Sequence, residues 1–211
     1  MAVKKSANVY IDGFNLYYGC CRGTPYRWLN LSKLCGQLLP EYQINRIRYF
    51  TAMIQATPAD PGGPQRQLTF IRALKTIPNL SIHYGLFTTH KVKRPHANSP
   101  PQGPNMVEVL DTKEKGSDVN LASYLLIDAF KKDSEASVVV SNDSDLVEPI
   151  RLARDELGLD VGILHPHRNY VRELDQVATF YRPIRERALR ACQFPAVLKD
   201  ADGAIRKPSS W

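Results

Sequence analysis

The sequence has few cysteines, and none of them belongs to a Cys-x-x-Cys pair. The 211 residues include four cysteines, at positions 20, 21, 35 and 192. Cys20 and Cys21 are neighbours in the chain, which is a poor geometry for a disulfide between them. A zinc site built on paired cysteines and a disulfide framework are therefore not indicated. We expect reduced thiols in a cytoplasmic protein.

Long apolar runs and glycine-rich nucleotide motifs are also missing. No stretch reaches the ~18 apolar residues that a membrane span needs. No apolar signal-peptide region follows the basic start Met1–Ser6, so we expect no association with a membrane. The absence of a Gly-x-Gly-x-x-Gly turn argues against a Rossmann-type flavin or nicotinamide enzyme, although it leaves open an unusual redox activity. Asp12-Gly13-Phe14 also lacks the Asp-x-Asp motif that haloacid-dehalogenase-like phosphatases place after their first strand.

Basic residues are in excess over acidic ones. The chain has 28 Lys and Arg against 21 Asp and Glu, which gives a net charge of +7 and a pI of about 9.3. A basic surface raises the local concentration of phosphate groups, so the composition favours a polyanionic partner.

Short apolar runs alternate with segments of helical periodicity. This order predicts a three-layer α/β/α fold with a central, mostly parallel sheet. We expect one domain over residues 1–193 and a basic, flexible tail over residues 194–211. Residues 90–105 are typical of a mobile loop or an insertion, and residues 106–110 of a strand that pairs back across it. The expected strands are residues 8–11, 46–52, 80–86, 138–140 and, as the last one, 161–164; the expected helices are residues 29–39, 65–76, 118–130, 146–157, 171–178 and 183–192.

Acidic residues follow two of the apolar strands and begin one helix. Asp143 and Asp145 come directly after Ser137–Val140, and Asp12, with Asn15 nearby, comes directly after Val9–Ile11. Open α/β sheets bind ligands beyond the carboxyl ends of their strands. Asp118 lies in the first turn of the most apolar helix, which we expect to be largely buried. The pattern favours a site for a hard divalent cation, Mg²⁺ or Mn²⁺. Each residue alone also fits a local role, because Asp12 fits a turn residue, Asn15 and Asp145 fit helix caps, and Asp118 fits a helix N-terminal acid.

Three sequence blocks resemble the signature of the NYN domain, a family of the PIN-like nuclease superfamily that includes the LabA-like proteins. The blocks are Asp12-Gly13-Phe14-Asn15, Lys115-Gly116-Ser117-Asp118-Val119 and Ser141-Asn142-Asp143-Ser144-Asp145-Leu146. The resemblance implies a PIN-like fold and an Mg²⁺- or Mn²⁺-dependent ribonuclease. It assigns Asp12, Asp118, Asp143 and Asp145 as metal ligands and Asn15 as a polar positioning residue. Asn142 departs from the glycine that many relatives have, and residues 83–105 match no part of the pattern.

Other residues are candidates for contact with RNA. We predict that Lys115, Arg168 and Arg172 bind substrate phosphates, although each also fits a solvated surface position. Aromatic and basic side chains alternate between Tyr17 and Trp28, where bases would stack if these rings were not part of the core. His165-Pro166-His167 fits a turn at a strand end better than a zinc site, since further ligands are not evident.

Two functions remain open from the sequence. The first is a metal-dependent endoribonuclease, and the second is a non-catalytic module of the LabA-like type that binds RNA or a protein partner. The sequence leaves homo-oligomer formation open. Asp143 is the residue that we expect most firmly to bind the metal.

Overall fold

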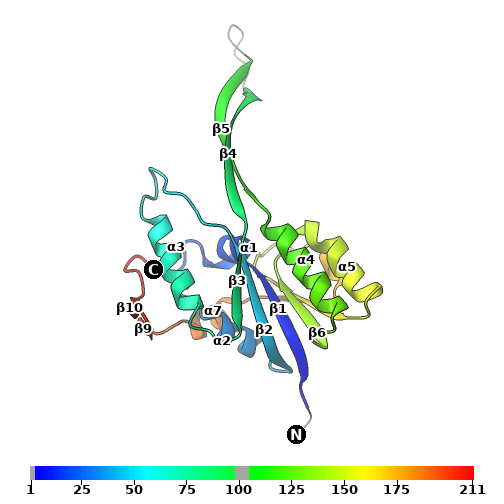
Figure 1. Cartoon of the computed structure of the whole chain (residues 1–211). Coiled ribbons are helices and arrows are strands. Elements are labelled where there is room, and N and C mark those ends of the chain that lie inside the picture. Colours follow the sequence, from blue (N-terminus) through cyan, green and yellow to red (C-terminus); the bar gives the residue numbers. More distant parts are fainter. Residues whose placement is uncertain (1–2, 98–104) are drawn as a thin grey trace.

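A parallel sheet of six strands forms the centre of the protein, whose computed structural model describes residues 3–97 and 105–211. The strands follow the spatial order β3-β2-β1-β6-β7-β8 (Figure 1). The two apolar runs that precede the acidic residues lie side by side at its centre, since β1 and β6 pair from Ala7 with Ala136 to Ile11 with Val140. The strands are β1 (Lys5–Asp12), β2 (Tyr42–Thr51), β3 (Leu80–Tyr84), β6 (Ala136–Val140), β7 (Asp160–His165) and β8 (Phe180–Pro183).

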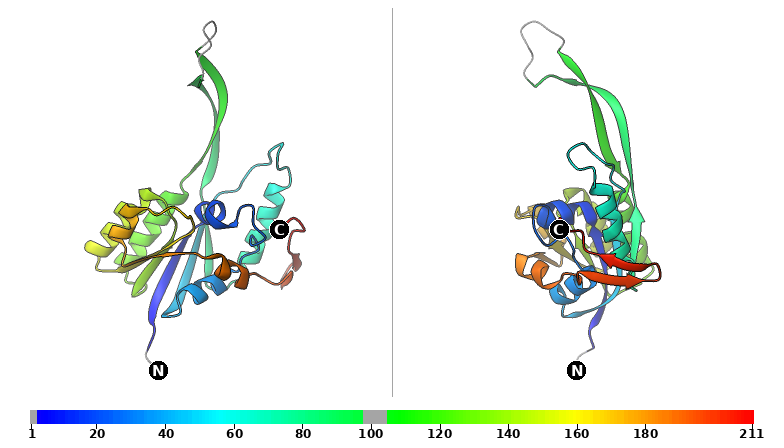
Figure 2. Two further views of the ribbon diagram at one scale, coloured as in Figure 1. Left: turned by 180° about the vertical axis from the view of Figure 1, so that it is seen from behind. Right: turned by 90° about the vertical axis from the view of Figure 1, so that its left-hand side faces the viewer.

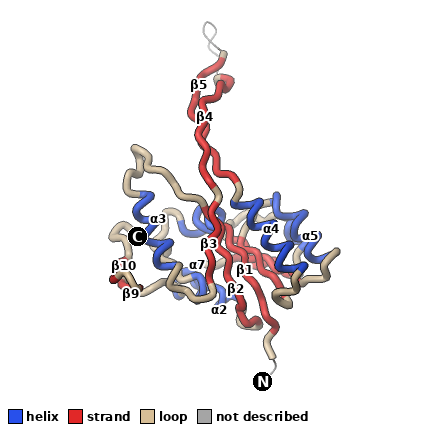
Figure 3. Tube along the Cα trace, viewed as in Figure 1, coloured by secondary structure: helices blue, strands red, loops and turns tan. Residues whose placement is uncertain are grey.

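Helices cover both faces of this sheet, so the predicted three-layer α/β/α fold is confirmed (Figure 3). One apolar core lies under one group of helices and a second core lies under the other group, on the opposite face. Within the described residues no helix is both long and apolar enough to cross a membrane. The first face carries α2 (Leu31–Leu38), α3 (Gly63–Leu74) and α7 (Glu186–Ala191), and the second carries α4 (Ser117–Phe130), α5 (Val147–Asp155) and α6 (Arg172–Val177).

Helix α4 is less buried than its composition predicts. Leu121, Leu125 and Ala129 face the sheet and are buried, while Val119 and Phe130 are 68% and 72% exposed. A helix in an outer layer presents only one stripe to the sheet, whatever the character of its other side chains. The prediction of a largely buried helix is therefore wrong for its outer face.

A long β-hairpin projects from the body of the protein (Figures 1 and 2). Its strands β4 (Leu86–Pro95) and β5 (Met106–Lys115) pair antiparallel along their whole length. The predicted return strand is confirmed and is longer than expected, whereas the predicted loop is wrong for residues 90–95, which belong to β4. Residues 98–104 of that predicted loop lie outside the described residues. The strand β4 was not predicted because it is rich in basic side chains. Two of these side chains form ion pairs across the hairpin, Lys91 with Glu108 and Arg94 with Asp111.

The C-terminal segment is folded onto the body, which corrects the prediction of a flexible tail. Strands β9 (Val197–Asp200) and β10 (Gly203–Arg206) form a second hairpin, and Ile205 within it is buried. The Trp211 ring lies 6.2 Å from the Trp28 ring and 5.9 Å from the Phe70 ring, measured between centroids. Ile205 and Trp211 pack against parts of the core that are distant in the sequence. Such packing cannot be predicted from the local spacing of apolar residues. The extent of the domain, residues 1–193, stays a prediction.

The sheet continues one strand further than the sequence indicates. Residues 161–164 were expected to be the last strand, but β8 pairs with β7 beyond them. The predicted helix over residues 183–192 is correspondingly shorter, because it begins at Glu186. The four residues of β8, Phe-Tyr-Arg-Pro, contain no apolar run that would mark a strand.

Candidate active site

The site lies where the chain reverses its direction across the sheet. From β1 the chain continues to β2 and β3 on one side, and it later returns to β6, β7 and β8 on the other side. In open α/β folds the carboxyl ends of two such central strands form the crevice that takes the ligand. Asp12 is the last residue of β1, and Asp143 follows the end of β6 by three positions.

A tight turn at Gly13 directs the chain from β1 into the short helix α1 (Gly13–Leu16). A Cβ atom at Gly13 would lie 2.6 Å from the Tyr49 ring and 2.7 Å from the Phe50 carbonyl oxygen, so the position has room only for glycine. Asp12 is the N-cap of α1, and its Oδ1 accepts a hydrogen bond of 2.9 Å from the Asn15 backbone N–H. The glycine therefore fixes where the Asp12 carboxylate and the Asn15 side chain stand.

Hydrogen bonds join the ends of β1 and β6. The Ser141 hydroxyl donates to Asp12 Oδ2 at 3.1 Å, and the Asn142 backbone N–H donates to Asn15 Oδ1 at 2.9 Å. Asn15 thus positions the loop after β6 rather than capping a helix. These two hydrogen bonds connect the block Asp12–Asn15 with the block that begins at Ser141. They therefore fix the position of the two acidic blocks relative to each other.

Asp143 and Asp145 have different places in the loop that follows. Asp143 is the N-cap of the 3₁₀ turn η2 (Ser144–Leu146), where its Oδ1 accepts from the Asp145 backbone N–H at 2.9 Å. The Asp143 backbone N–H donates in turn to the Ser141 hydroxyl at 3.1 Å. The capping role that the sequence allowed for Asp145 belongs to Asp143, and Asp145 is exposed.

Three of the four predicted acids, Asp12, Asp118 and Asp143, meet at one depression, which we call the acidic hollow, whereas Asp145 does not line it. Its volume is about 410 Å³. Among the described residues that line it, none is Lys or Arg, so its negative charges are not neutralised locally. It is lined by Asp12, Asn15, Asp118 and Asp143 together with Phe14, Tyr18, Phe87, Glu114, Ser117 and His167.

The acidic hollow perturbs the ionisation of its carboxyl groups. Burial raises the pKa of Asp12 to about 6, the hydrogen bond from Asn15 opposes this change, and the charge of Asp118 adds to it. Burial also raises the pKa of Asp118, with a further contribution from Asp143. Crowded carboxylates of this kind are less stable as anions until a cation joins them.

The acidic hollow fits a hydrated divalent ion better than a bare one. Across residues 3–97 and 105–211, no group of three or more His, Cys, Asp or Glu side chains is already arranged to hold a metal. The donors of Asp12, Asp118 and Asp143 are nevertheless all hard oxygens, without a Lys or Arg in the lining. Mg²⁺ usually keeps several of its waters, and these waters would bridge the remaining distance to the carboxylates.

The three basic residues predicted to bind substrate lie elsewhere. Lys115, Arg168 and Arg172 are exposed, and none of them lines the acidic hollow. Lys115 pairs with Leu86 at the base of the projecting hairpin. Their contact with RNA phosphates stays a prediction for the rim around the site.

His167 and Glu114 are part of the acidic hollow although the sequence did not assign them to it. His165-Pro166-His167 does form the expected strand-end turn, in which the His165 Nδ1 atom and the His167 carbonyl oxygen are hydrogen-bonded at 2.9 Å. That turn follows β7, which lies parallel to β6 and ends at the same edge of the sheet. The rule that predicted Asp143 at this edge could therefore have predicted His167 as well. Glu114 belongs to strand β5 of the projecting hairpin. Its carboxylate also accepts a hydrogen bond of 3.1 Å from the backbone N–H of Ser117, the first residue of α4. No local pattern marks it.

The blocks around Asp12, Asp118 and Asp143 agree with a family model. The model of the NYN domain matches residues 6–185. The chain belongs to the NYN domain family. NYN domains are nuclease-like members of the PIN-like superfamily, so the predicted family and the PIN-like fold are confirmed.

This NYN protein is similar in sequence to one known protein and in fold to another. It is 31% identical over 232 residues to the 6-hydroxy-3-succinoylpyridine 3-monooxygenase HspA of Pseudomonas putida, an alignment that covers 96% of this chain and 74% of HspA. A crystal structure of a Vibrio parahaemolyticus protein of unknown function superposes with a TM-score of 0.57 at 17% identity, covering 87% of this chain and 94% of the other. The second match supports the fold alone.

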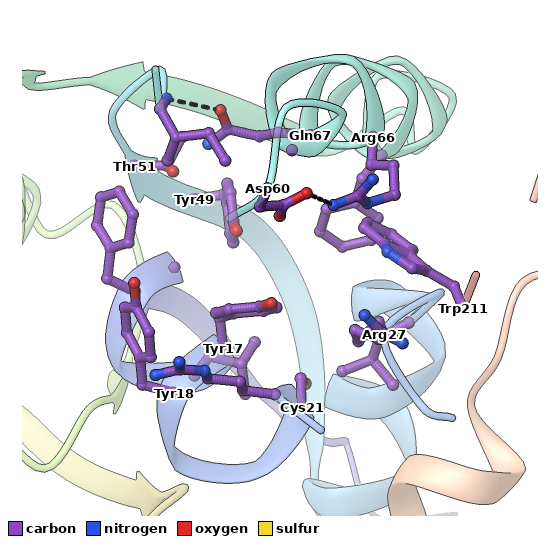
Figure 4. A pocket seen from close by; sticks show the side chains of 18 of the residues that line it. Tyr17, Tyr18, Cys21, Arg27, Tyr49, Thr51, Asp60, Arg66, Gln67 and Trp211 are labelled. Carbon is purple, nitrogen blue, oxygen red and sulfur yellow. Dashed lines mark hydrogen bonds and ion pairs between the residues drawn. The ribbon is translucent and has the colours of Figure 1, made fainter. Parts of the chain in front are cut away.

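A second depression, the aromatic cavity, adjoins the acidic hollow (Figure 4). Its volume is about 390 Å³, and Phe14 and Tyr18 line both depressions. Four aromatic or basic residues of the predicted stacking segment, Tyr17, Tyr18, Arg22 and Arg27, line it, whereas Trp28 is buried in the core. The walls come from the π-helical turn η1 (Tyr17–Cys21), from β2, from α3 with the loop before it, and from the end of the chain; the rings are Phe14, Tyr17, Tyr18, Tyr49, Phe70 and Trp211.

Proposed function

We propose that this NYN protein is an endoribonuclease that hydrolyses RNA phosphodiester bonds with Mg²⁺ or Mn²⁺. The observation that carries the proposal is the acidic hollow, where Asp12, Asp118 and Asp143 from three separate segments face one space without a Lys or Arg in its lining. Such a gathering of like charges has no use in packing, because it raises the energy of each carboxylate. The nuclease-like character of the family and the net charge of +7 support RNA as the substrate.

The residues of the acidic hollow take distinct roles in this proposal. Asp12, Asp118 and Asp143 would hold the ion, with Asp145 adding negative charge beside Asp118. A bound Mg²⁺ or Mn²⁺ lowers the pKa of a water and neutralises charge on the phosphodiester. Asn15 would keep the ends of β1 and β6 together, because its Oδ1 accepts a hydrogen bond from the Asn142 backbone N–H.

Two further groups would serve the substrate. His167, which lines the acidic hollow, would give a proton to the leaving oxygen. Lys115, Arg168 and Arg172 would bind phosphates of the RNA outside the acidic hollow.

The Asp143→Asn variant tests this proposal. Asparagine still caps the turn η2, so the fold is retained, while one anionic ligand is lost. Cleavage of an end-labelled single-stranded RNA in Mn²⁺ is expected to fall at least ~100-fold, and a chelator should abolish cleavage by the parent chain. Asp202→Asn, on an exposed turn of the C-terminal hairpin, is the matched control and should cleave like the parent.

Two results would reject or redirect the proposal. If Asp143→Asn cleaves RNA as fast as the parent, the metal mechanism is wrong. If the parent binds RNA but shows no metal-dependent cleavage, the non-catalytic binding module becomes the better description.

A second candidate function is oxidation of a small heteroaromatic acid. It is favoured by the aromatic cavity together with the likeness to HspA, whose name states a monooxygenase acting on 6-hydroxy-3-succinoylpyridine. Such a reaction places one atom of O₂ in the substrate, while a reduced nicotinamide or flavin supplies the electrons that convert the other atom to water. We expect oxygen- and donor-dependent consumption of 6-hydroxy-3-succinoylpyridine, followed by liquid chromatography, if this function holds. An unchanged pyridine together with metal-dependent RNA cleavage would exclude it.

A further inference from the structure

We propose that the aromatic cavity binds a planar aromatic ring that carries a negatively charged group. This inference stands on the aromatic cavity alone and does not depend on the reaction at the acidic hollow. The volume of about 390 Å³ lies within the ~300–1,000 Å³ of typical small-molecule sites. Such sites combine apolar walls with a few polar groups that orient the ligand, and both features are present here.

The walls of the aromatic cavity are suited to a flat ring. Tyr17 and Trp211, far apart in the sequence, approach it from different sides, and Tyr49 lies toward its interior (Figure 4). Tyr49 and Thr51 are 7% and 2% exposed, so the inner part is set by the buried end of β2. Aromatic side chains that line a cavity can stack on a planar ligand at little entropic cost, since each ring has few rotatable bonds.

The charges around the aromatic cavity favour an anion. Three arginine side chains line it against one acidic side chain, and that side chain, Asp60, is already paired with Arg66. In the described part of the chain, no carboxylate lies within ion-pair distance of Arg22 or Arg27. The Arg22 guanidinium lies 5.3 Å from the Tyr18 ring centroid, and the Arg27 guanidinium lies 5.7 Å from the Trp211 ring centroid.

Arginines that already lie against aromatic rings are preorganised for an anionic ligand. Arg27 donates to the carbonyl oxygens of Thr24 at 3.2 Å and Ser210 at 2.6 Å, so its side chain is fixed and its charge is not neutralised. Arg22 is exposed and lines the aromatic cavity, and within the described residues its guanidinium donates no hydrogen bond, so its donors can take a carboxylate or a phosphate. A ring between the aromatic walls would therefore bring its anionic group toward Arg22.

Two sources supply a ring and an anion together, namely a nucleotide and a free heteroaromatic carboxylate. Four probes separate them: adenosine monophosphate, nicotinate, ribose 5-phosphate and nicotinamide. The last two each lack one half of the proposed ligand, because ribose 5-phosphate has no aromatic ring and nicotinamide has no charge. We expect adenosine monophosphate or nicotinate to bind the full chain about tenfold more tightly than the control that lacks its ring or its charge. Titration calorimetry and quenching of tryptophan fluorescence measure the affinities.

Three variants locate the binding in the aromatic cavity. Arg22→Gln and Tyr17→Ala remove an exposed charge and a ring from its walls, and each should weaken binding about tenfold. Arg187→Gln is the matched control, because Arg187 is exposed on α7 and does not line the aromatic cavity. Circular dichroism melts of all three confirm that the fold is intact.

Tighter binding of adenosine monophosphate assigns the ring to a nucleotide, and tighter binding of nicotinate assigns it to a free aromatic acid. The proposal is overturned if neither probe binds at millimolar concentration. It is equally overturned if Arg187→Gln weakens binding as much as Arg22→Gln does. These binding results support or overturn the proposal whether or not the protein cleaves RNA.

Discussion

The Asp12→Asn variant is expected to melt at a higher temperature than the parent chain at pH 7 and to lose metal-dependent RNA cleavage. Burial raises the pKa of Asp12 from 3.8 to about 6, so at pH 7 the folded protein carries a buried charge at a cost of about 3 kcal/mol. Asparagine removes the charge and still offers an oxygen to Asn15. The expected gain in melting temperature is about 5–10 °C in metal-free buffer, measured by differential scanning calorimetry.

The pH dependence of this gain identifies its cause. A carboxyl group whose pKa is raised on folding keeps a proton that the unfolded chain has released, in the window between about pH 4 and 6. The contribution of Asp12 to the free energy of unfolding is therefore fully present below pH 4, falls as the pH rises through this window, and stays low above it. The variant should lack this fall. An equal difference between variant and parent at pH 4 and pH 7 would show that the charge is not responsible.

Divalent cations should reverse the order of stability. Mn²⁺ that binds only the folded state stabilises the parent by an amount that grows with the logarithm of its concentration above the dissociation constant, whereas the variant has lost a ligand. The melting temperature of the parent should therefore rise with added Mn²⁺ while that of Asp12→Asn stays nearly constant. Asp202→Asn, which leaves the acidic hollow intact, should respond like the parent. A similar rise for Asp12→Asn would place the ion elsewhere.

The positions of the main acids were predictable because they depend on a local pattern and one general rule. Val9–Ile11 and Ser137–Val140 are apolar enough to be central parallel strands, and parallel strands end at the same edge of a sheet. Acids directly after them must therefore lie near each other. Asp118 was harder to place, since only the packing of α4 across β1 and β2 brings its first turn to that edge.

What the sequence did not reveal depends on contacts between distant segments. Glu114 reaches the acidic hollow only because the projecting hairpin starts at its rim, and a hairpin rich in basic side chains does not look like a strand. Trp211 closes the aromatic cavity from the far end of the chain. Strand β8 is stabilised by its pairing with β7 and not by its own composition. Each of these features depends on contact with a residue more than ten positions away in the sequence. Local periodicity carries no information about such contacts.

The largest loss of stability is expected from Asp128→Ala, which breaks a buried ion pair on α4. The Arg48 guanidinium donates to both oxygens of Asp128, at 2.7 and 2.9 Å, and the Tyr10 hydroxyl donates to the same carboxylate at 2.9 Å. Asp128 and Arg48 are only 6% and 8% exposed. Removing the carboxylate leaves a buried, unpaired guanidinium, which should lower the free energy of unfolding by about 3–5 kcal/mol in urea titrations.

A second ion pair, whose arginine lies on the same strand β2 as Arg48, provides the control. Arg46 and Asp133 form an ion pair whose side chains are 42% and 29% exposed, so Asp133→Ala should cost about 1 kcal/mol, although Asp133 also accepts from Asn8. If both variants lose the same stability, burial is not what makes the inner pair important.

A double variant separates the ion pair from the packing around it. Replacing Arg48 by Met and Asp128 by Leu removes both charges together and should recover most of the stability that Asp128→Ala loses. Because α4 carries Asp118 at its first turn and Asp128 near its last, the buried pair also fixes the helix that brings Asp118 to the acidic hollow. The double variant should therefore fold well, and its RNA cleavage shows how much of the site depends on the placement of α4. Cleavage equal to that of the parent would mean that apolar packing of Leu121 and Leu125 is sufficient to place Asp118.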